Sequence, residues 1–133
     1  MSKTILAVED DSISRFMIEK MCEALGYLCK SVADGQQCLD EIAQRPHAYS
    51  VILMDIHMPK VSGVEATSAI RGFDDDPPKN LPIIAVTADD HWQNPQRCKE
   101  NGFSDVVSKP VTIDALTSAL EKFVRPMGDG EPA

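Results

Sequence analysis

The sequence predicts an α/β fold, a doubly wound, five-stranded parallel sheet in the order 2-1-3-4-5 with helices on both faces. Short, apolar, β-branched runs alternate along the chain with longer stretches in which apolar residues recur every three or four positions. Strands that alternate with single helices give a (βα)5 arrangement, in which right-handed crossovers place helices on both faces of the sheet. Polar residues also follow four of the apolar runs, and ligands bind at the carboxyl ends of strands in open sheets of this kind.

The strands are indicated by short runs that are bounded by polar residues or glycine. Two of these runs, residues 5–8 and 51–54, are continuously apolar, which is typical of central strands covered on both faces. The predicted strands are residues 4–8, 27–32, 51–54, 81–86 and 105–107.

The helices are indicated by the spacing of their apolar residues and by the residues that flank them. Gly26 follows the first helical stretch as a C-terminal cap, and Pro46 ends the second. Asn94 and Pro95 suit the N-cap and first position of a short fourth helix, which ends near Gly102 and follows an irregular loop. The predicted helices are residues 13–25, 36–45, 63–71, 95–102 and 113–124.

Length and composition indicate one domain, residues 1–124, followed by a flexible tail at residues 125–133. The chain has 133 residues, of which 43% are hydrophobic, enough for one core but not for a second folded domain. Residues 73–80 are expected to form a mobile surface loop, because they combine aspartates and prolines.

Charge and cysteine usage exclude several classes of function. A net charge of -8 and a sequence pI of about 4.7 disfavour binding to nucleic acids or anionic membranes. The first apolar run is too short for a signal peptide or a membrane span, so we expect a cytoplasmic protein. The cysteines lack CxxC spacing and are expected to be reduced packing residues, namely Cys22, Cys29, Cys38 and Cys98.

The polar residues at the strand ends form the candidate site. Asp10 and Asp11 follow the first strand and Asp55 follows the third, and in the predicted order these two strands flank the ligand-binding crevice. Carboxylates held close together repel each other, and Mg²⁺ suits them because it takes oxygen ligands and bridges them to a phosphate. Thr87 and Lys109, which follow the fourth and fifth strands, can bind further phosphoryl oxygens.

In this order and at these spacings, the residues resemble those of the receiver domains of two-component response regulators, the CheY-like superfamily with a flavodoxin-like fold. The resemblance covers about residues 3–124. It rests on Asp10 and Asp11 after the first strand, the segment 51–59, Gly63, Thr87 with Ala88, and Lys109 with Pro110.

The resemblance implies that Asp55 is the phosphoacceptor and takes a phosphoryl group from a phosphohistidine of a histidine kinase or a histidine phosphotransfer protein. It implies that Thr87 moves toward the acyl phosphate, that Lys109 pairs with it, and that the bond between Lys109 and Pro110 is cis. It also implies a Mg²⁺ site made of Asp10, Asp11, Asp55 and the main-chain carbonyl of His57.

Some of these residues also suit simpler roles. Asp11 or Ser12 is placed to cap the first helix, and this role is compatible with metal binding. The side chain of His57 lacks the partner ligands of a metal site, so we expect it to line the mouth of the crevice together with Asp89.

One position departs from the family pattern. Receiver domains commonly carry an aromatic residue on the fifth strand, three positions before the lysine, and Val106 occupies that position here. We therefore hypothesise that the response runs through the loop at residues 88–94 and the short helix after it. Trp92 and Phe103 are expected to pack at the surface rather than to form a cofactor site.

Together these features predict a stand-alone receiver domain that is phosphorylated on Asp55 with Mg²⁺ and acts on a downstream protein by contact or in a phosphorelay. We expect the protein to be a phosphoacceptor domain rather than an enzyme that turns over a separate substrate. We also expect no direct contact with nucleic acid or membranes. Met1 and the tail favour a complete protein over a segment of a hybrid kinase. The alternatives are a receiver-like module that is not phosphorylated and a Mg²⁺-dependent aspartyl phosphohydrolase. Such a hydrolase needs a second carboxylate where this chain has His57.

Overall fold

A computed structural model describes residues 4–124 of the chain. Within this range, strands and helices alternate, and a 3-10 turn, η1, precedes α4. The strands are β1 (Thr4–Val8), β2 (Leu28–Val32), β3 (Val51–Asp55), β4 (Ile83–Thr87) and β5 (Asp105–Ser108). The helices are α1 (Ser12–Ala24), α2 (Gly35–Gln44), α3 (Gly63–Arg71), α4 (Pro95–Glu100) and α5 (Ile113–Glu121), with η1 at Asp90–Gln93.

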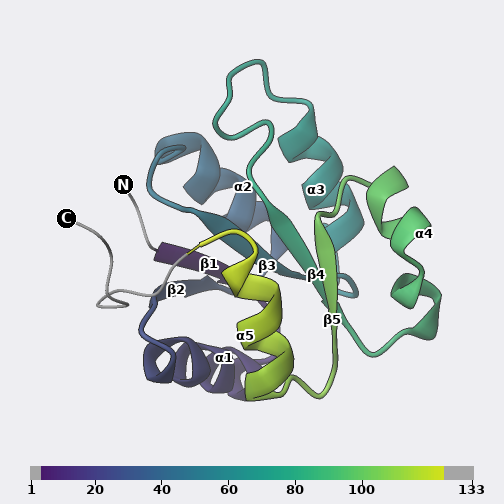
Figure 1. The fold of residues 1–133 in the computed structure, drawn as a ribbon. Helices are drawn as coiled ribbons and strands as arrows, with labels where there is room; N and C mark the ends of the chain where they lie inside the picture. The colour runs from purple at the N-terminus through teal and green to yellow at the C-terminus, as the bar shows by residue number, and fades with distance from the viewer. Residues whose placement is uncertain (1–3, 125–133) are drawn as a thin grey trace.

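The strands form one parallel sheet in the order β2-β1-β3-β4-β5, so the predicted fold class is confirmed. Figure 1 shows α1 and α5 on one face of this sheet and α2, α3 and α4 on the other. Every residue of β3 and β4 is buried, as expected of inner strands with helices on both sides.

The core has two halves, one on each face of the sheet. Along β1, Ile5 and Ala7 point toward α1 and α5, and Leu6 and Val8 point toward α2 and α3. This alternation follows from the two-residue period of a strand. Burial of each large aliphatic side chain contributes on the order of 2 kcal/mol to the free energy of unfolding. The sheet is therefore a stable support for the loops at its ends.

The element boundaries lie within about three residues of the predicted ones, and the clearest difference is at η1. The sequence predicts an irregular loop there, whereas residues 90–93 form a 3-10 turn that begins with Asp89 as its N-cap. Gly102 has a φ of 89°, a left-handed conformation that ends the region of α4.

The prediction that Trp92 and Phe103 pack at the surface is wrong. They are 6% and 4% exposed, and their rings meet edge to face at a centroid distance of 5.7 Å. Both belong to the core half that α2, α3 and α4 cover. A single aromatic residue within a polar loop has no periodic neighbours, so its burial leaves no pattern in the sequence.

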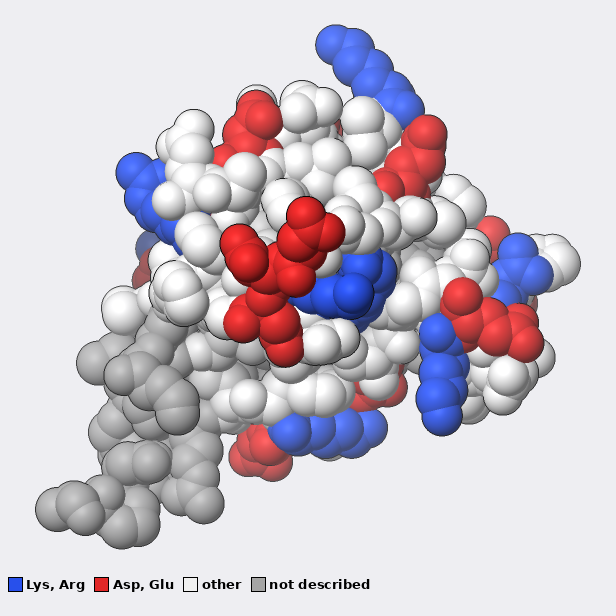
Figure 2. All heavy atoms as spheres, turned by 90° about the horizontal axis from the view of Figure 1, so that it is seen from above, with Lys and Arg blue, Asp and Glu red and all other residues white. Residues whose placement is uncertain are grey.

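Residues 72–80 lie in the connection between α3 and β4, at the edge of the sheet where the strands begin (Figure 1). The segment contains neither helix nor strand, as expected. Arg71 holds the end of this segment in place. Its Nη1 donates to the carbonyl oxygens of Lys79 and Leu81 at 2.8 Å each, and its Nε donates to the carbonyl oxygen of Gly102 at 3.0 Å. Seen from this side in Figure 2, acidic side chains gather near the middle of the molecule.

The predicted tail at residues 125–133 lies outside the described residues, so the division into a domain and a tail stays a prediction. Of the helices within residues 4–124, none has the length and apolar character needed to span a membrane. The cysteines are free thiols, as expected, and Cys22, Cys38 and Cys98 are buried.

Candidate functional site

The candidate site lies at the edge of the sheet where the strands end, opposite the 72–80 segment. Parallel pairing brings these ends to a common level, since Asp55 lies beside Val86 on β4 and Thr87 lies beside Ser108 on β5. Side chains that are far apart in the sequence therefore meet in one crevice between β1, β3 and the loop after β5.

Three carboxylates gather in this crevice, those of Glu9, Asp10 and Asp55. One oxygen atom from each lies within 4.8 Å of the other two. Glu9 and Asp55 are 2% and 4% exposed, whereas Asp10 is exposed to solvent. Mg²⁺ commonly binds one or two carboxylates and keeps its remaining positions for water and phosphate, so these residues fit the predicted metal site.

The acidic pair of this site is Glu9 and Asp10, which corrects the predicted pair of Asp10 and Asp11 by one residue. The carboxylate of Asp11 instead accepts a hydrogen bond from the Ser14 amide at 2.8 Å and caps α1, the alternative role expected for it. Glu9 follows β1 directly, and its Oε2 accepts the Asp11 amide at 3.1 Å. The sequence held a usable signal, because Glu9 is the first polar residue after the apolar run.

Asp55 and Glu9 share the ammonium group of Lys109. Nζ of Lys109 is 2.8 Å from Glu9 Oε1 and 3.4 Å from Asp55 Oδ2, so the predicted lysine is in the site. Burial and the charge of Glu9 raise the pKa of Asp55 to about 7, although Lys109 acts in the opposite direction. Burial also acts to raise the pKa of Glu9, but hydrogen bonds from Lys109 and the Asp11 amide outweigh it and lower this pKa.

Lys109 itself is held in its charged form. Burial acts to lower its pKa, but the hydrogen bond to Glu9 and the charge of Asp55 raise it overall. The peptide bond between Lys109 and Pro110 is cis, in agreement with the resemblance. The site thus contains one permanent cation for two buried acids, and a divalent cation would satisfy the remaining charge.

Thr87 ends β4 and is 1% exposed. Its Oγ1 accepts a hydrogen bond from the Asp89 amide at 3.0 Å. The carboxylate of Asp89 in turn lies 3.0 Å from Nε2 of His57. The side chains of His57 and Asp89 therefore meet beside the crevice, as expected, and the metal-binding role of the His57 carbonyl stays a prediction.

Gly63 lets the start of α3 approach the end of β3. A Cβ atom built at this position would lie only 2.2 Å from the carbonyl oxygen of Asp55 and 2.8 Å from Cα of Ile56. The Gly63 amide donates to the Ile56 carbonyl at 2.9 Å. A glycine is needed here because any side chain would displace the backbone that carries Asp55.

Val106 lies on β5 in register with Ala85 and is partly buried. A cavity of about 450 Å³ lies between α4 and β5, with Pro95, Cys98 and Val106 among the residues that line it. The position that is aromatic in many receiver domains is therefore occupied by a small side chain beside an open space.

The arrangement suits the transfer of a phosphoryl group to a carboxylate. Asp55 supplies a buried nucleophile, and Lys109 supplies a positive charge beside it. Glu9 and Asp10 supply oxygen ligands for a cation, which would stabilise the charge on the phosphoryl oxygens.

A family model and several known proteins are similar to this chain. The family model described as the response regulator receiver domain matches residues 5–121. The polar-differentiation response regulator DivK of Brucella anthropi is 32% identical over 124 residues, which are 93% of this chain and 98% of DivK. The sensor histidine kinase RcsC of Salmonella typhi is 36% identical over 116 residues, and this chain spans only 12% of its length.

A solved structure adds information about the metal. The receiver domain of a sensor histidine kinase from Pseudomonas aeruginosa PAO1 contains a magnesium ion coordinated in its active site cleft. It is 33% identical, covers 92% of this chain and 98% of its own, and superimposes with a TM-score of 0.79.

Proposed function

This chain belongs to the response regulator receiver domain family, and on that premise we propose that it accepts a phosphoryl group on Asp55, with Mg²⁺, from a phosphohistidine. The observation that carries the proposal is the position of Asp55, a buried carboxylate that shares the ammonium group of Lys109 with Glu9. The donor is a histidine kinase or a histidine phosphotransfer protein, and the phosphorylated domain then acts on a downstream protein.

Glu9, Asp10 and Asp55 would hold the metal ion, with the main-chain carbonyl of His57 as a further ligand. When bound, Mg²⁺ neutralises negative charge on the acids and on the incoming phosphoryl oxygens. The magnesium ion in the related receiver domain from Pseudomonas aeruginosa supports this assignment.

An oxygen of the Asp55 carboxylate attacks the phosphorus atom in line with the imidazole nitrogen of the donor. The P–N bond breaks as the P–O bond forms, and the imidazole keeps the electron pair and takes up a proton. Lys109 is already close to Asp55, at 3.4 Å, and can pair with a phosphoryl oxygen without a large movement. Attack by water on the acyl phosphate later releases inorganic phosphate and restores the carboxylate.

The face beside the crevice suits a protein donor. A cavity of about 420 Å³ joins the site to α1, since Glu9 and Lys109 line it together with Met17, Met21 and Val111. A donor must bring its phosphohistidine within contact distance of Asp55, so the donor surface must cover the residues of α1 and of the loop after β5 that line this cavity.

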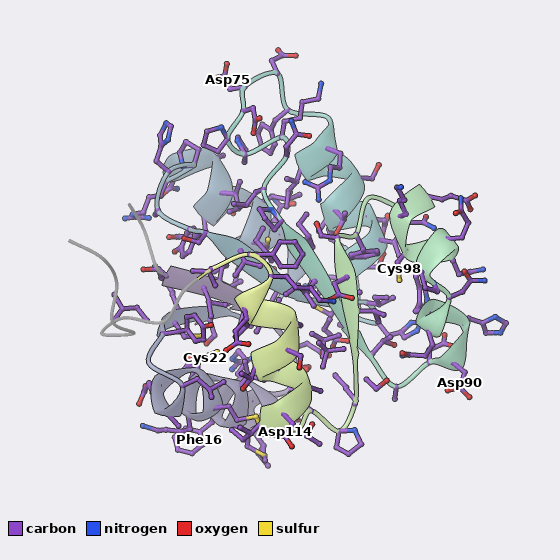
Figure 3. The ribbon with its side chains drawn as sticks, viewed as in Figure 1. Phe16, Cys22, Asp75, Asp90, Cys98 and Asp114 are labelled. Atoms are coloured by element: carbon purple, nitrogen blue, oxygen red, sulfur yellow. The ribbon has the colours of Figure 1, made fainter. Side chains whose placement is uncertain are left out.

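Large apolar side chains are exposed on α1 and at the start of α5. Ile13 and Phe16 of α1 are 69% and 59% exposed, and Ile113 of α5 is 42% exposed. Figure 3 shows Phe16 on the outer side of α1, pointing away from the sheet. We therefore infer that an apolar face of the donor packs against α1 and the start of α5.

We propose that the domain carries and then loses its phosphoryl group rather than turning over a separate substrate. Incubation with a phosphomonoester and Mg²⁺ is expected to release no phosphate. Repeated turnover would instead favour the aspartyl phosphohydrolase alternative. We also propose a cytoplasmic location, which the free thiols support because a reducing compartment preserves them.

The experiment that tests the proposal is phosphotransfer from a panel of phosphorylated histidine proteins to wild type and to Asp55→Asn. Wild type is expected to gain one acid-stable, base-labile label, and Asp55→Asn is expected to gain none. A variant that keeps the label would place the phosphorylation elsewhere. A wild type that gains no label from any donor or from acetyl phosphate would favour the module that is not phosphorylated.

A further inference from the structure

We propose that Arg15 is a positioning residue for the magnesium site, which holds the main chain of Glu9 and Asp10 so that their carboxylates stay close to Asp55. The inference rests on the proposed function, because it takes these three carboxylates as the residues that hold Mg²⁺. It deepens that function, since it names a residue outside the carboxylate group on which metal binding depends.

The guanidinium group of Arg15 binds the loop between β1 and α1. Its Nη1 donates to the carbonyl oxygen of Glu9 at 2.9 Å and to that of Asp10 at 3.2 Å. Nη1 carries two hydrogens, so it can donate one to each carbonyl. Two consecutive residues of the carboxylate group are therefore held by one side chain.

The Glu9 carbonyl lies just after the end of β1, where the chain leaves the sheet. The Glu9 amide still donates to the Val32 carbonyl oxygen of β2 at 3.1 Å. Glu9 is 2% exposed, and a buried carbonyl without a donor is unfavourable. Arg15 supplies that donor from α1 and thereby fixes the path of the loop at its first residue.

Asp10 depends on this anchor more than Glu9 does. The Glu9 carboxylate has contacts of its own, since Oε1 is 2.8 Å from Nζ of Lys109 and Oε2 accepts the Asp11 amide at 3.1 Å. The Asp10 carboxylate is exposed, so its distance from the other two carboxylates is set by the main chain that carries it. Loss of the guanidinium group should therefore displace Asp10 first.

The position of Arg15 in α1 argues against a role in stabilising the helix itself. Arg15 is the fourth residue of α1, close to the helix N-terminus, where the helix dipole disfavours a positive charge. Side chains of a helix lean toward its N-terminus, so from this position the guanidinium group reaches back to the β1–α1 loop. The unfavourable interaction with the dipole is offset by contacts outside the helix.

Charge and positioning predict opposite effects on metal binding. A guanidinium group beside a site for a divalent cation repels that cation, so if Arg15 acted only through its charge, its removal would strengthen Mg²⁺ binding. If Arg15 acts by holding the loop, its removal weakens Mg²⁺ binding. Loss of a residue that supports metal ligands commonly weakens metal binding about tenfold or more. The sign of the change therefore separates the two roles.

Calorimetric titration with Mg²⁺ alone measures this change. Arg15→Met keeps an unbranched stem but removes the charge and the donors, and we expect it to bind Mg²⁺ about tenfold more weakly than wild type. Arg15→Lys keeps the charge on a shorter side chain without the planar group, and we expect intermediate binding. Lys20→Met is the matched control, because Lys20 lies on the same helix, pairs with Glu23 at 3.4 Å, and should leave Mg²⁺ binding nearly unchanged.

Two further measurements separate positioning from a general effect on stability. Phosphorylation of Arg15→Met by acetyl phosphate should need about tenfold more Mg²⁺ to reach half of its maximal rate, while the rate at saturating Mg²⁺ stays near that of wild type. Without Mg²⁺, the amide NMR signals of residues 9–11 should shift in Arg15→Met and stay in place in Lys20→Met. A merely structural role would lower the free energy of unfolding and leave the Mg²⁺ affinity of the folded protein unchanged.

The outcomes distinguish this inference from the proposed function. Mg²⁺ binding in Arg15→Met that equals or exceeds that of wild type overturns the inference and leaves phosphorylation of Asp55 standing. Equal weakening in Arg15→Met and Lys20→Met also overturns it, as does wild-type binding in Arg15→Lys, which decides alone if Arg15→Met does not fold. A wild type that binds no Mg²⁺ overturns the metal site of the proposed function, and the inference fails with it.

Discussion

At the scale of single residues, the buried carboxylate of Asp55 makes the stability of the metal-free protein depend on pH. Burial and Glu9 raise its pKa from 3.8 to about 7. The unfolded chain therefore releases this proton at a lower pH than the folded chain does, and the contribution of Asp55 to stability falls as the pH rises from about 4 to about 7. Above this window the folded protein holds an unfavourable charge.

Replacing Asp55 by asparagine should remove that unfavourable charge. We expect Asp55→Asn without Mg²⁺ to be more stable than wild type above a pH of about 7 by on the order of 2 kcal/mol, and to show no gain near pH 4. Urea denaturation at both pH values measures the difference. Asp10→Asn, at the exposed member of the carboxylate group, should gain less. Identical pH profiles for wild type and Asp55→Asn would contradict this explanation.

The assignment of the acidic pair can be tested by Mg²⁺ binding. Glu9→Gln removes a buried charge of the carboxylate group and should weaken Mg²⁺ binding about tenfold, equivalent to about 1.4 kcal/mol. Asp11→Ala should leave Mg²⁺ binding nearly unchanged and lower the free energy of unfolding by about 1 kcal/mol, because it removes the cap of α1. Calorimetric titration measures the first effect and urea denaturation the second. Weak binding in Asp11→Ala with normal binding in Glu9→Gln would restore the pair predicted from the sequence.

The residue scale also shows what a sequence can and cannot determine about such a site. The strand ends bring Asp55 and Lys109 together and place Thr87 at the same edge of the sheet, because parallel strands end together. The sequence does not identify Glu9 as a member of the site, because its place there depends on where β1 ends and on Asp11 turning back to cap α1. Local sequence patterns define the exact first and last residues of a strand or helix less well than its presence.

At the scale of elements, the approach of α3 to β3 is the most tightly constrained contact near the site. Gly63→Ala would place a methyl group 2.2 Å from the Asp55 carbonyl oxygen, so the start of α3 must shift. We expect a loss of about 2–3 kcal/mol in the free energy of unfolding, together with weaker Mg²⁺ binding. Gly72→Ala at the other end of α3 is the matched control, because its new methyl group would meet no atom closer than 3.4 Å. Equal stability of the two variants in urea denaturation would contradict the proposed constraint.

The elements also differ in how far the sequence predicts them. Helices and strands with apolar periodicity are recovered within a few residues, since packing on the sheet reinforces the local pattern. The 3-10 turn η1 is not recovered, because it depends on the capping side chain of Asp89 and on burial of Trp92 under α4. Both are tertiary features that involve single residues. The hypothesis that the response runs through residues 88–94 stays a prediction.

At the scale of the whole molecule, the apolar face of α1 contrasts with an overall charge of -8. The proposed docking of the donor on this face predicts that Phe16→Ser slows phosphotransfer from a phosphohistidine protein by about tenfold or more, as expected for an interface residue worth 1–2 kcal/mol. Phosphorylation by acetyl phosphate should be unchanged, because a small donor needs no docking surface.

Leu28→Ser provides the control for that experiment. Leu28 is 55% exposed, similar to Phe16, but pairs with Thr4 at the far end of β1, away from the crevice. It should therefore leave both reactions unchanged. A Phe16→Ser variant that is equally slow with acetyl phosphate would point to damage of the site rather than to loss of docking.

The hydrogen bonds of Arg71 have a practical consequence for protein engineering. Within residues 4–124, the hydrogen bonds of the guanidinium group go to the main-chain oxygens of Lys79, Leu81 and Gly102, so they are independent of the side chains at those positions. Both α3 and the entry to β4 are anchored without help from the exposed tip at Asp74 and Asp75. A peptide tag or fluorophore inserted at this tip would lie at the opposite edge of the sheet from Asp55, and could report on the domain without obstructing its partners.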